Sequence, residues 1–490
     1  MKKIKACSIA AIAVVAVCLF TNTSMAVSLP VFPKHHVSLT DFGAVNDGVT
    51  LNTEAFSNAI AALSVKGGGE LIVPAGYWLT GPIKLESNIN LHLERGALIQ
   101  FSRDYHLYPL MVFDMKGEKS VDSTSPITGQ DLENVAITGE GIIDGGGDAW
   151  RMIKKEKLGT MEWDALVASG GVLDADGTTW WPNTNIMSGA KIAARLMSEG
   201  SLNLADYEPA HESMRPKMVH LVGIKKLLLQ GVTFQNPPNW TLNPALCENV
   251  TILDVKVHNA YSAQNSDALD LESCRHVLIQ DSTFDAGDDG ICFKSGKDAA
   301  GRRIGVPDED VTVKGCTVYH AHGGFVIGSE MSGGMKNIHV DNCTFIGTDN
   351  GLRFKSARGR GGVVEDIHIS NIRMENILQD AIVFEMYYEK KGADMSGTNM
   401  PPVNEGTPLF RDIHFENIIC RGAQKAMVLT GLPEMPIRDF DFKNVSISAR
   451  LGAFVTDANN ITFDNVHVDC RTGAPLTEKR VTNSKLDLVQ

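Results

Sequence analysis

EDVTVKG (309–315) opens a phrase that returns along the chain as KNIHVDN (336–342), EDIHISN (365–371) and RDIHFEN (411–417). Each copy has two polar residues, then apolar residues at alternating positions, then a polar or glycine corner. Alternation with a period of two is typical of a β-strand that buries one face. Asn and Asp tolerate left-handed backbone and hydrogen bond to their neighbours, so these corners suit tight turns between strands.

Weaker copies of the phrase extend the repeat, at ENVAITG (133–139), ENVTILD (248–254), RHVLIQD (275–281), RDFDFKN (438–444) and NNITFDN (459–465). Most steps between the apolar anchors are roughly 21 to 34 residues long, a spacing that indicates a solenoid. The chain is therefore predicted to be all-β and to form a parallel β-helix whose coils stack on one another. An antiparallel sandwich, the alternative, lacks the expected hairpin turns and would not need a repeat.

Three segments depart from this repeat. Residues 52–63 place apolar side chains at helical spacing, which predicts a short N-terminal helix that covers the open end of the solenoid. Residues 150–218 hold four of the six tryptophans and are predicted to be a large insertion that stands out from one coil. A smaller break runs from 392 to 409. No linker divides the rest, so we predict a single domain over residues 27–490.

The first 26 residues predict a signal peptide. Lysines stand at positions 2, 3 and 5, an apolar run covers residues 9–20, and Ser24-Met25-Ala26 is a small-x-small cleavage site. The apolar run is too short for a membrane anchor, and no later segment is predicted to span a membrane. We therefore expect export to the periplasm or the extracellular space.

The overall charge limits the class of partner. A formal net charge of −13 argues against nucleic acid. A polyanionic ligand would need a local basic cluster, and Arg353, Lys355, Arg358 and Arg360 form one. Arg358 and Arg360 would either contact further carboxylates of the ligand or be solvated. The oligomeric state is not predicted.

Seven of the nine cysteines lie beyond the leader, at Cys247, Cys274, Cys292, Cys316, Cys343, Cys420 and Cys470. Their spacing fits no zinc pattern, so neither a metal nor another cofactor is predicted. Cys247 with Cys274, and Cys316 with Cys343, would stack in adjacent coils, either as disulfides or as buried thiols.

A second strand can be aligned in five coils, at DALDLES (267–273), DGICFKS (289–295), GGFVIGS (323–329), NGLRFKS (350–356) and DAIVFEM (380–386). The third and fifth residues of each are apolar and point into the core. The residues between them face outward in two rows, Asp270, Cys292, Val326 and Arg353 in one, and Glu272, Lys294, Gly328 and Lys355 in the next. Neighbouring residues of a row lie about 4.8 Å apart.

Acidic residues gather at the entry to this strand. Asp267 and Asp289 fall in one column on adjacent coils, Asp288 precedes Asp289, and His322 takes the position of Asp288 one coil further on. Repulsion between close carboxylates raises the pKa of at least one of them, which keeps a general acid protonated near neutral pH. The pattern predicts an acid–base site.

At these residues the chain resembles the polygalacturonase family, glycoside hydrolase family 28, and its bacterial exo-acting members. That family has the signatures Asn-Thr-Asp, Gly-Asp-Asp, Gly-His-Gly and Arg-Ile-Lys. They correspond here to Asn265-Ser266-Asp267, Gly287-Asp288-Asp289, Ala321-His322-Gly323 and Arg353-Phe354-Lys355. Ser266 replaces Thr and Ala321 replaces the first Gly, and both changes leave the functional atoms in place.

The resemblance implies a right-handed β-helix that hydrolyses α-1,4-galacturonosyl bonds of pectin with inversion. Asp288 would protonate the leaving oxygen, and Asp267 and Asp289 would activate a water. His322 would orient the acid. The side chains that would bind substrate are Asn265, Arg353, Lys355 and Tyr388. Lys294, which faces outward on the same strands, is a further candidate from its position alone.

Several alternatives remain open from the sequence. Lys294 would either bind substrate or pair with Glu272 across the strands, and Lys355 has Glu385 as a neighbour. Exo action is predicted because the insertion after Trp150 would wall off one end of the groove. The rival functions are a hydrolase of rhamnogalacturonan or xylogalacturonan, a calcium-dependent pectate lyase, and a glycan-binding β-helix without activity.

Overall fold

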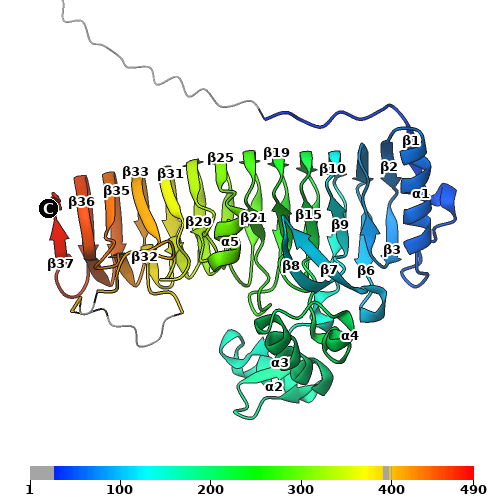
Figure 1. Ribbon diagram of the computed structural model, residues 1–490, viewed down its shortest axis with the longest axis horizontal. Coiled ribbons are helices and arrows are strands. Elements are labelled where there is room, and N and C mark those ends of the chain that lie inside the picture. The colour runs from blue at the N-terminus through cyan, green and yellow to red at the C-terminus, as the bar shows by residue number, and fades with distance from the viewer. Residues whose placement is uncertain (1–26, 390–394, 396, 399, 490) are drawn as a thin grey trace, which may run out of the picture.

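The computed structural model describes residues 27–389, 395, 397, 398 and 400–489, so the predicted leader lies outside the described residues. Within this part of the chain 32 strands join in one sheet system that winds into a solenoid (Figure 1). Neighbouring coils pair in parallel, and the predicted parallel β-helix is confirmed. No helix among the described residues is long and apolar enough to cross a membrane.

Each coil contributes a strand to three faces. The first face contains β4 (Ile83–Lys84), β9 (Ile127–Gln130), β15 (Val219–Val222), β18 (Leu242–Ala245), β21 (Leu269–Glu272), β24 (Ile291–Lys294), β27 (Gly323–Ile327), β30 (Asn350–Lys355), β32 (Asp380–Glu385), β34 (Lys425–Thr430), β36 (Leu451–Cys470) and β37 (Leu476–Thr482). The second face contains β1 (His36–Ser38), β2 (Gly69–Val73), β5 (Ile89–Leu93), β10 (Glu133–Gly139), β16 (Lys225–Gln230), β19 (Glu248–Leu253), β22 (Arg275–Gln280), β25 (Asp308–Lys314), β28 (Met335–Asp341), β31 (Val363–Glu375), β33 (Leu409–Arg421) and β35 (Ile437–Ala449). The third face contains β3 (Gly76–Thr80), β6 (Ala97–Phe101), β11 (Ile142–Asp144), β17 (Thr233–Gln235), β20 (Lys256–His258), β23 (Thr283–Asp285), β26 (Thr317–Tyr319) and β29 (Thr344–Ile346). The long strands β31, β33, β35 and β36 continue onto it, and β36 also crosses the second face beside β35.

The corners have the predicted left-handed backbone. The residue that ends the repeated phrase has a positive φ of 52 to 66° in its four clear copies, at Gly315, Asn342, Asn371 and Asn417. Asn and Asp adopt this conformation at lower cost than branched side chains do. The predicted anchors Val277, Val311 and Ile338 consequently stand in direct register on successive coils.

Phenylalanines fill the interior behind the first face. Phe293, Phe325, Phe354 and Phe384 lie on successive coils and are among the most completely buried large side chains. The rings of Phe354 and Phe384 stack with centroids 4.1 Å apart, and Phe293 meets Phe325 edge-on at 5.2 Å. Burying each such side chain stabilises the fold by about 1.5–3 kcal/mol. This ladder fixes the strands from which the predicted site residues project outward.

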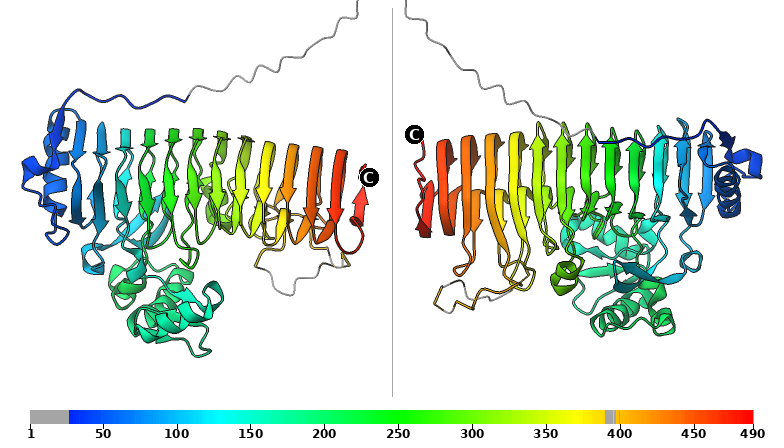
Figure 2. Two further views of the ribbon diagram at one scale, coloured as in Figure 1. Left: turned by 180° about the vertical axis from the view of Figure 1, so that it is seen from behind. Right: turned by 45° about the horizontal axis from the view of Figure 1, so that its top comes forward.

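The N-terminal end of the solenoid is covered by α1 (Thr53–Val65), as predicted. Its buried face consists of Ala55, Phe56, Ala59, Ile60 and Leu63. The helix lies across the first coils at the end opposite the C-terminus (Figures 1 and 2). It thereby removes the exposed edge that an open stack of coils would leave.

The predicted insertion forms a separate lobe beside the first face (Figures 1 and 2). Its elements are β12 (Ile153–Lys154), α2 (Thr160–Ala168), β13 (Val172–Leu173), β14 (Thr179–Trp181), α3 (Thr184–Ser198) and α4 (Leu204–Tyr207). Trp150 and Trp163 are buried, and Trp180 and Trp181 are half-buried, so packing uses most of these rings.

A hairpin of β7 (Leu110–Met115) and β8 (Glu118–Ser123) was not predicted from the sequence. Leu110 and Val121 of the hairpin pack with Leu196 of α3 and Tyr207 of α4 in a second small core. The apolar residues of the hairpin pack on the insertion and not on the solenoid core. Their pattern in the local sequence therefore does not predict the hairpin. The hairpin and the insertion together flank the N-terminal half of the first face.

The seven cysteines in the described part of the chain are all free thiols, and six of them are buried. The backbone N–H of Cys247 lies 3.4 Å from Sγ of Cys274, so the predicted stacking of this pair on adjacent coils is present. Of the two possibilities that the sequence left open, the structure has the thiols.

Candidate active site

The register of the first face places the predicted residues in one row. Asp270, Cys292, Val326 and Arg353 are successive strand partners, as the alignment of the five segments requires. Glu272 and Lys294 are likewise backbone partners in the next row. The alignment of the sequence therefore identifies correctly which side chains share this face.

Asp289 is buried against two cations. Nζ of Lys355 donates to its Oδ2 over 2.6 Å, and Nη1 of Arg353 lies 3.4 Å from its Oδ1. Burial alone would raise the pKa of Asp289, but the positive charges of Lys355 and Arg353 outweigh it and hold the pKa well below its usual value. Asp289 is therefore a carboxylate throughout the neutral pH range.

Asp288 interacts with a histidine of the next coil. Nδ1 of His322 lies 3.0 Å from Oδ1 of Asp288, and the backbone N–H of Asp289 donates to the same oxygen over 3.0 Å. The backbone N–H of His322 also donates to the carbonyl of Asp288 over 2.7 Å. These three contacts fix the orientation of the Asp288 carboxyl group relative to the imidazole.

Asp267 has the opposite environment to Asp289. It is 3% exposed, and its Oδ1 has no hydrogen-bond partner among the described residues. Burial, followed by the negative charges of Asp270 and Asp288, raises its pKa well above the usual value. Asp267 and Asp289 thus favour opposite protonation states although they stand one coil apart.

Lys294 is held inside the protein. Its Nζ lies 3.3 Å from Oδ1 of Asp270 and 3.4 Å from Oε2 of Glu330. The alternative of an ion pair with Glu272 is wrong, because the side chain of Lys294 leaves its own row and turns to Asp270 in the neighbouring row. Burial raises the pKa of Asp270 to about 7, although Lys294 opposes this shift.

Three further predicted residues surround these acids. Tyr388 presents its ring to two cations, with Lys355 Nζ 5.1 Å and Arg353 Cζ 5.7 Å from the centroid. Lys355 pairs with Asp289 and not with Glu385, which is only its backbone partner. Oδ1 of Asn265 accepts a hydrogen bond from Arg215 over 2.8 Å.

The basic run continues away from the acids. Nε and Nη2 of Arg358 contact both carboxylate oxygens of Glu434, the longer contact being 2.8 Å. Arg360 donates to the carbonyl of Ser329 and to Asp298. Both side chains therefore have protein partners, and neither stands open to a ligand carboxylate or to solvent alone.

Four residues that the sequence did not single out also line the site. Nζ of Lys157 lies 2.8 Å from Nε2 of His322, and Arg215 donates to the carbonyl of Gln264. Lys217 and Trp240 form a cation–ring contact of 4.7 Å. Of these four residues, only Trp240 could have been found from the sequence. It lies two residues before Leu242, just as Asp267 lies two residues before Leu269, and the two leucines are partners on adjacent strands. Lys157, Arg215 and Lys217 belong to the insertion, where no repeat exists to align them.

The N-terminal end of this face is covered by the hairpin. The ring of Phe113 lies 4.7 Å from that of His220, which projects from β15. At the tip, Glu118 accepts two hydrogen bonds of 2.6 and 2.9 Å from Arg303 of α5 (Asp298–Ile304). The hairpin therefore reaches from the early coils to α5, which follows β24 in the coil that carries Asp288 and Asp289.

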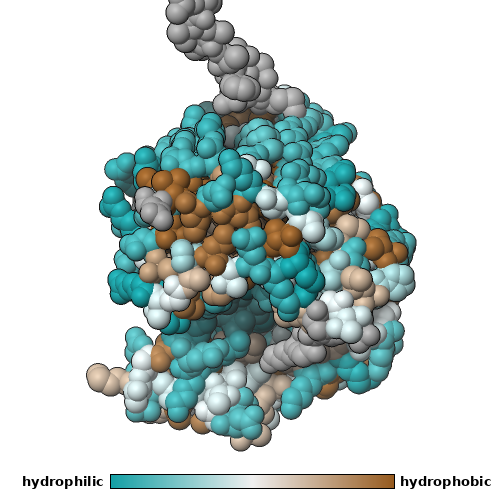
Figure 3. Space-filling view, turned by 90° about the vertical axis from the view of Figure 1, so that its left-hand side faces the viewer, coloured by the Kyte–Doolittle hydropathy of each residue, from teal (hydrophilic) through white to brown (hydrophobic). Residues whose placement is uncertain are grey.

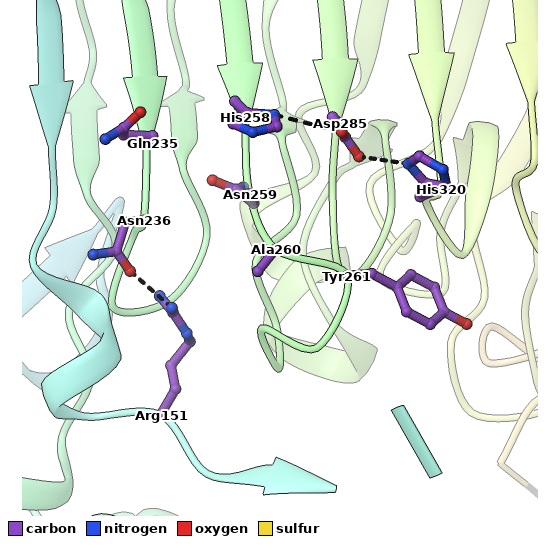
Figure 4. Close-up of a pocket in the computed structure, with 9 residues that line it drawn as sticks. All are labelled: Arg151, Gln235, Asn236, His258, Asn259, Ala260, Tyr261, Asp285 and His320. Carbon is purple, nitrogen blue, oxygen red and sulfur yellow. Dashed lines mark hydrogen bonds and ion pairs between the residues drawn. The ribbon is translucent and has the colours of Figure 1, made fainter. Parts of the chain in front are cut away.

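A polar cavity of about 430 Å³ lies on the other side of the loop that follows β20 (Figure 4). Its wall includes Arg151, and Asp285 lies between His258 and His320 at 3.4 and 3.1 Å. The ring of Tyr261 extends away from Arg151 (Figure 4), and its hydroxyl lies 3.4 Å from Asp349. Tyr261 thus separates this cavity from the acidic cluster.

One group of side chains has the spacing of a metal site. Single ligand atoms of Asp288, Asp289 and His322 lie within 4.8 Å of one another. Two cations already contact Asp289, however, and a divalent ion at this position would face Lys355 and Arg353 directly. The donor set therefore fits an acid–base cluster better than a metal centre.

Known proteins resemble this chain in sequence and in fold. The profile of glycosyl hydrolases family 28 matches residues 154–472. The crystal structure of an exopolygalacturonase from Thermotoga maritima superposes with a TM-score of 0.76 at 32% identity, over 90% of this chain and 94% of that one. The exo-poly-α-D-galacturonosidase of Dickeya chrysanthemi is 28% identical over 88% of this chain and 71% of that protein. A probable polygalacturonase of Vitis vinifera is 26% identical over 84% and 74%. The resemblance carried by the four tripeptides is confirmed, and the chain belongs to family 28 of the glycosyl hydrolases.

Proposed function

We propose that this enzyme hydrolyses α-1,4-galacturonosyl bonds of polygalacturonate with inversion, and that it acts from a chain end. The observation that carries this proposal is the contrasting contacts of two neighbouring acids, since Asp288 contacts His322 whereas Asp289 contacts Lys355 and Arg353. Asp289 is held ionised by two cations, whereas burial favours the protonated form of Asp267. An acid and a base side by side are what glycoside hydrolysis by two carboxyl groups requires.

Asp288 acts as the general acid in this scheme. Its Oδ1 contacts His322 and accepts from the backbone N–H of Asp289, so Oδ2 is the oxygen available for proton transfer. Oδ2 is then the atom that faces the leaving oxygen of the glycosidic bond. Asp289 accepts the proton of the attacking water, and Asp267 holds that water by donating to it or accepting from it.

Arg353, Lys355 and Tyr388 bind the substrate on the C-terminal side of the acids. Two cations beside one ring suit a sugar that carries a carboxylate. Asn265, which contacts Arg215, would bind the substrate on the opposite side, because its coil precedes the coil of Asp288 and Asp289. Lys294 acts indirectly, because its ammonium group is committed to Asp270 and Glu330.

Exo action is supported by the shape of the site. The insertion and the hairpin flank the N-terminal coils of the first face, and the hairpin is tied to α5 by Glu118 and Arg303. Seen from the C-terminal end, a hydrophilic recess lies between the solenoid and the segments below it (Figure 3). A polymer that enters from this end meets the insertion shortly beyond the acids, so only a short stretch of chain fits past the cleaved bond. The T. maritima and D. chrysanthemi relatives are themselves named as exo-acting enzymes.

The place of action follows from the substrate. Polygalacturonate is a polymer, and the predicted leader over residues 1–26 would export the enzyme to meet it outside the cytoplasm. We also propose that residues 27–490 form a single domain.

A time course of products from de-esterified polygalacturonate, separated by size, tests the proposal. Free galacturonate or one short oligomer with a saturated end should appear first. A ladder of mixed oligomers would retain hydrolysis and remove exo action, and an unsaturated product would indicate a lyase. If polygalacturonate gave no product, the same assay on rhamnogalacturonan and xylogalacturonan would decide between a branched substrate and a protein that only binds glycans.

A further inference from the structure

Lys157 brings a positive charge to the catalytic cluster from the insertion. It ends a 3₁₀ turn over Lys155–Lys157, and its Nζ lies 2.8 Å from Nε2 of His322, 165 residues further along the chain. The same ammonium group lies 3.8 Å from the ring centroid of Tyr261. A cation above an aromatic ring is held in place by the negative face of that ring. The position of Lys157 is therefore built from two separate elements of the solenoid.

The contact between Lys157 and His322 determines which of the two groups donates the hydrogen bond. An ammonium group has three donors and no acceptor, so Nε2 of His322 must be the acceptor. The imidazole is then neutral and has its proton on Nδ1, which donates to Oδ1 of Asp288 over 3.0 Å. This arrangement leaves the proton of the acid to Asp288 itself.

The surrounding charges would favour a different arrangement without Lys157. His322 stands between two carboxylates, with Asp288 at 3.0 Å from Nδ1 and Asp349 at 3.9 Å from Nε2. Two negative neighbours stabilise an imidazolium ion. Burial lowers the pKa of Lys157. The negative charges of Asp349, Asp288 and Glu156 act on this pKa in the opposite direction. On the Nε2 side of the ring, the positive charge of Lys157 opposes the effect of these acids on His322.

We propose that Lys157 is a positioning residue for catalysis: it keeps His322 neutral, with its proton on Nδ1, so that the proton used in the reaction stays on Asp288. The inference rests on the proposed role of Asp288 as the acid. It also gives the insertion a part in the chemical step in addition to its part in closing the groove.

Steady-state kinetics on polygalacturonate as a function of pH test the inference. In Lys157→Met, kcat should fall about 10- to 100-fold, part of the contribution of a general acid. The alkaline limb of the kcat profile should also move to lower pH, because a protonated His322 favours the ionised form of Asp288. Lys157→Arg retains the positive charge and should keep the limb in place. Lys155→Met, an exposed lysine of the same turn, should match the wild type in both respects.

A double-mutant cycle separates positioning from substrate binding. In a His322→Gln background, Lys157→Met should change kcat by less than about threefold, since coupled residues are not additive. An increase in KM with unchanged kcat and pH profile would assign Lys157 to the substrate carboxylate and overturn the inference. Additive losses in the cycle would overturn it as well.

¹⁵N NMR of the histidine rings gives a readout that needs no substrate. In the wild type at neutral pH the resonances of His322, assigned by their absence in His322→Gln, should show the proton on Nδ1 alone. In Lys157→Met they should show the imidazolium ion. A wild type without activity on any pectic polymer would remove the proposed function, whereas unchanged His322 resonances in Lys157→Met would remove only this inference.

Discussion

Nζ of Lys355 lies 2.6 Å from Oδ2 of Asp289, and both side chains are buried on the first face, Asp289 just before β24 and Lys355 at the end of β30. The two residues are 66 positions apart in the sequence and two coils apart in the solenoid. Arg353 adds a second positive charge at 3.4 Å. Because two cations share one carboxylate, this contact fixes a negative charge in a place where burial alone would neutralise it.

Asp289→Asn should abolish activity and also destabilise the protein. The substitution leaves Lys355 and Arg353 buried without their carboxylate, and removing one partner of a buried pair costs about 3–5 kcal/mol. Urea unfolding at neutral pH measures the loss. A variant as stable as the wild type would mean that solvent reaches the two cations in the folded state.

Asp267→Asn should abolish activity and yet stabilise the protein, by an amount that grows with pH. The folded-state pKa of Asp267 lies well above its unfolded value of about 3.9. The wild type therefore loses stability as pH rises from the unfolded value through the folded one, whereas asparagine does not titrate. Thermal unfolding at pH 4 and pH 8 should show the larger advantage at pH 8. A constant difference would contradict the raised pKa.

Asp288→Asn should lower kcat by about 10²- to 10⁴-fold, the usual contribution of a general acid. Its carboxyl group is half-buried and hydrogen-bonded to His322, and asparagine keeps an acceptor for that contact. The melting temperature should therefore stay close to that of the wild type. Retained activity in a correctly folded variant would exclude Asp288 as the acid.

Replacing residues 113–120 of the hairpin by a two-residue turn, which keeps Leu110 and Val121 in the core shared with the insertion, should change the product pattern. The deletion removes Phe113 from His220 and Glu118 from Arg303, and so opens the N-terminal end of the groove. Mixed oligomers should then appear early in a digest. Arg303→Ala, which breaks only the exposed ion pair at the tip, is the matched control and should keep the short products. Unchanged products from the deletion would assign exo action to the insertion alone.

The repeat and the stacking of the predicted site residues could be read from the sequence, because a β-helix is nearly one-dimensional. Each coil contacts only its neighbours, so residues at the same place in successive copies are neighbours in space. This is why Asp270, Cys292, Val326 and Arg353 form the predicted row.

Side-chain partners within the row were less predictable. The backbone register pairs Lys294 with Glu272, but Nζ of Lys294 contacts Asp270 and Glu330. A lysine has four side-chain torsions, and it turns toward the carboxylate whose burial it can offset. The backbone register fixes the position of the Cα atom of Lys294 but not the position of its ammonium group.

The sequence by itself determined the solenoid and the acids and cations that share one face, since both follow from a repeat that aligns with itself. It also determined the N-terminal cap, which follows from the helical spacing of apolar residues over 52–63. Only the tertiary structure decided that Lys157 contacts His322, that Arg215 contacts Asn265, and that the hairpin covers His220. These contacts join the solenoid to segments without a repeat. Their geometry depends on how one folded body packs on another, and no local pattern of residues encodes it.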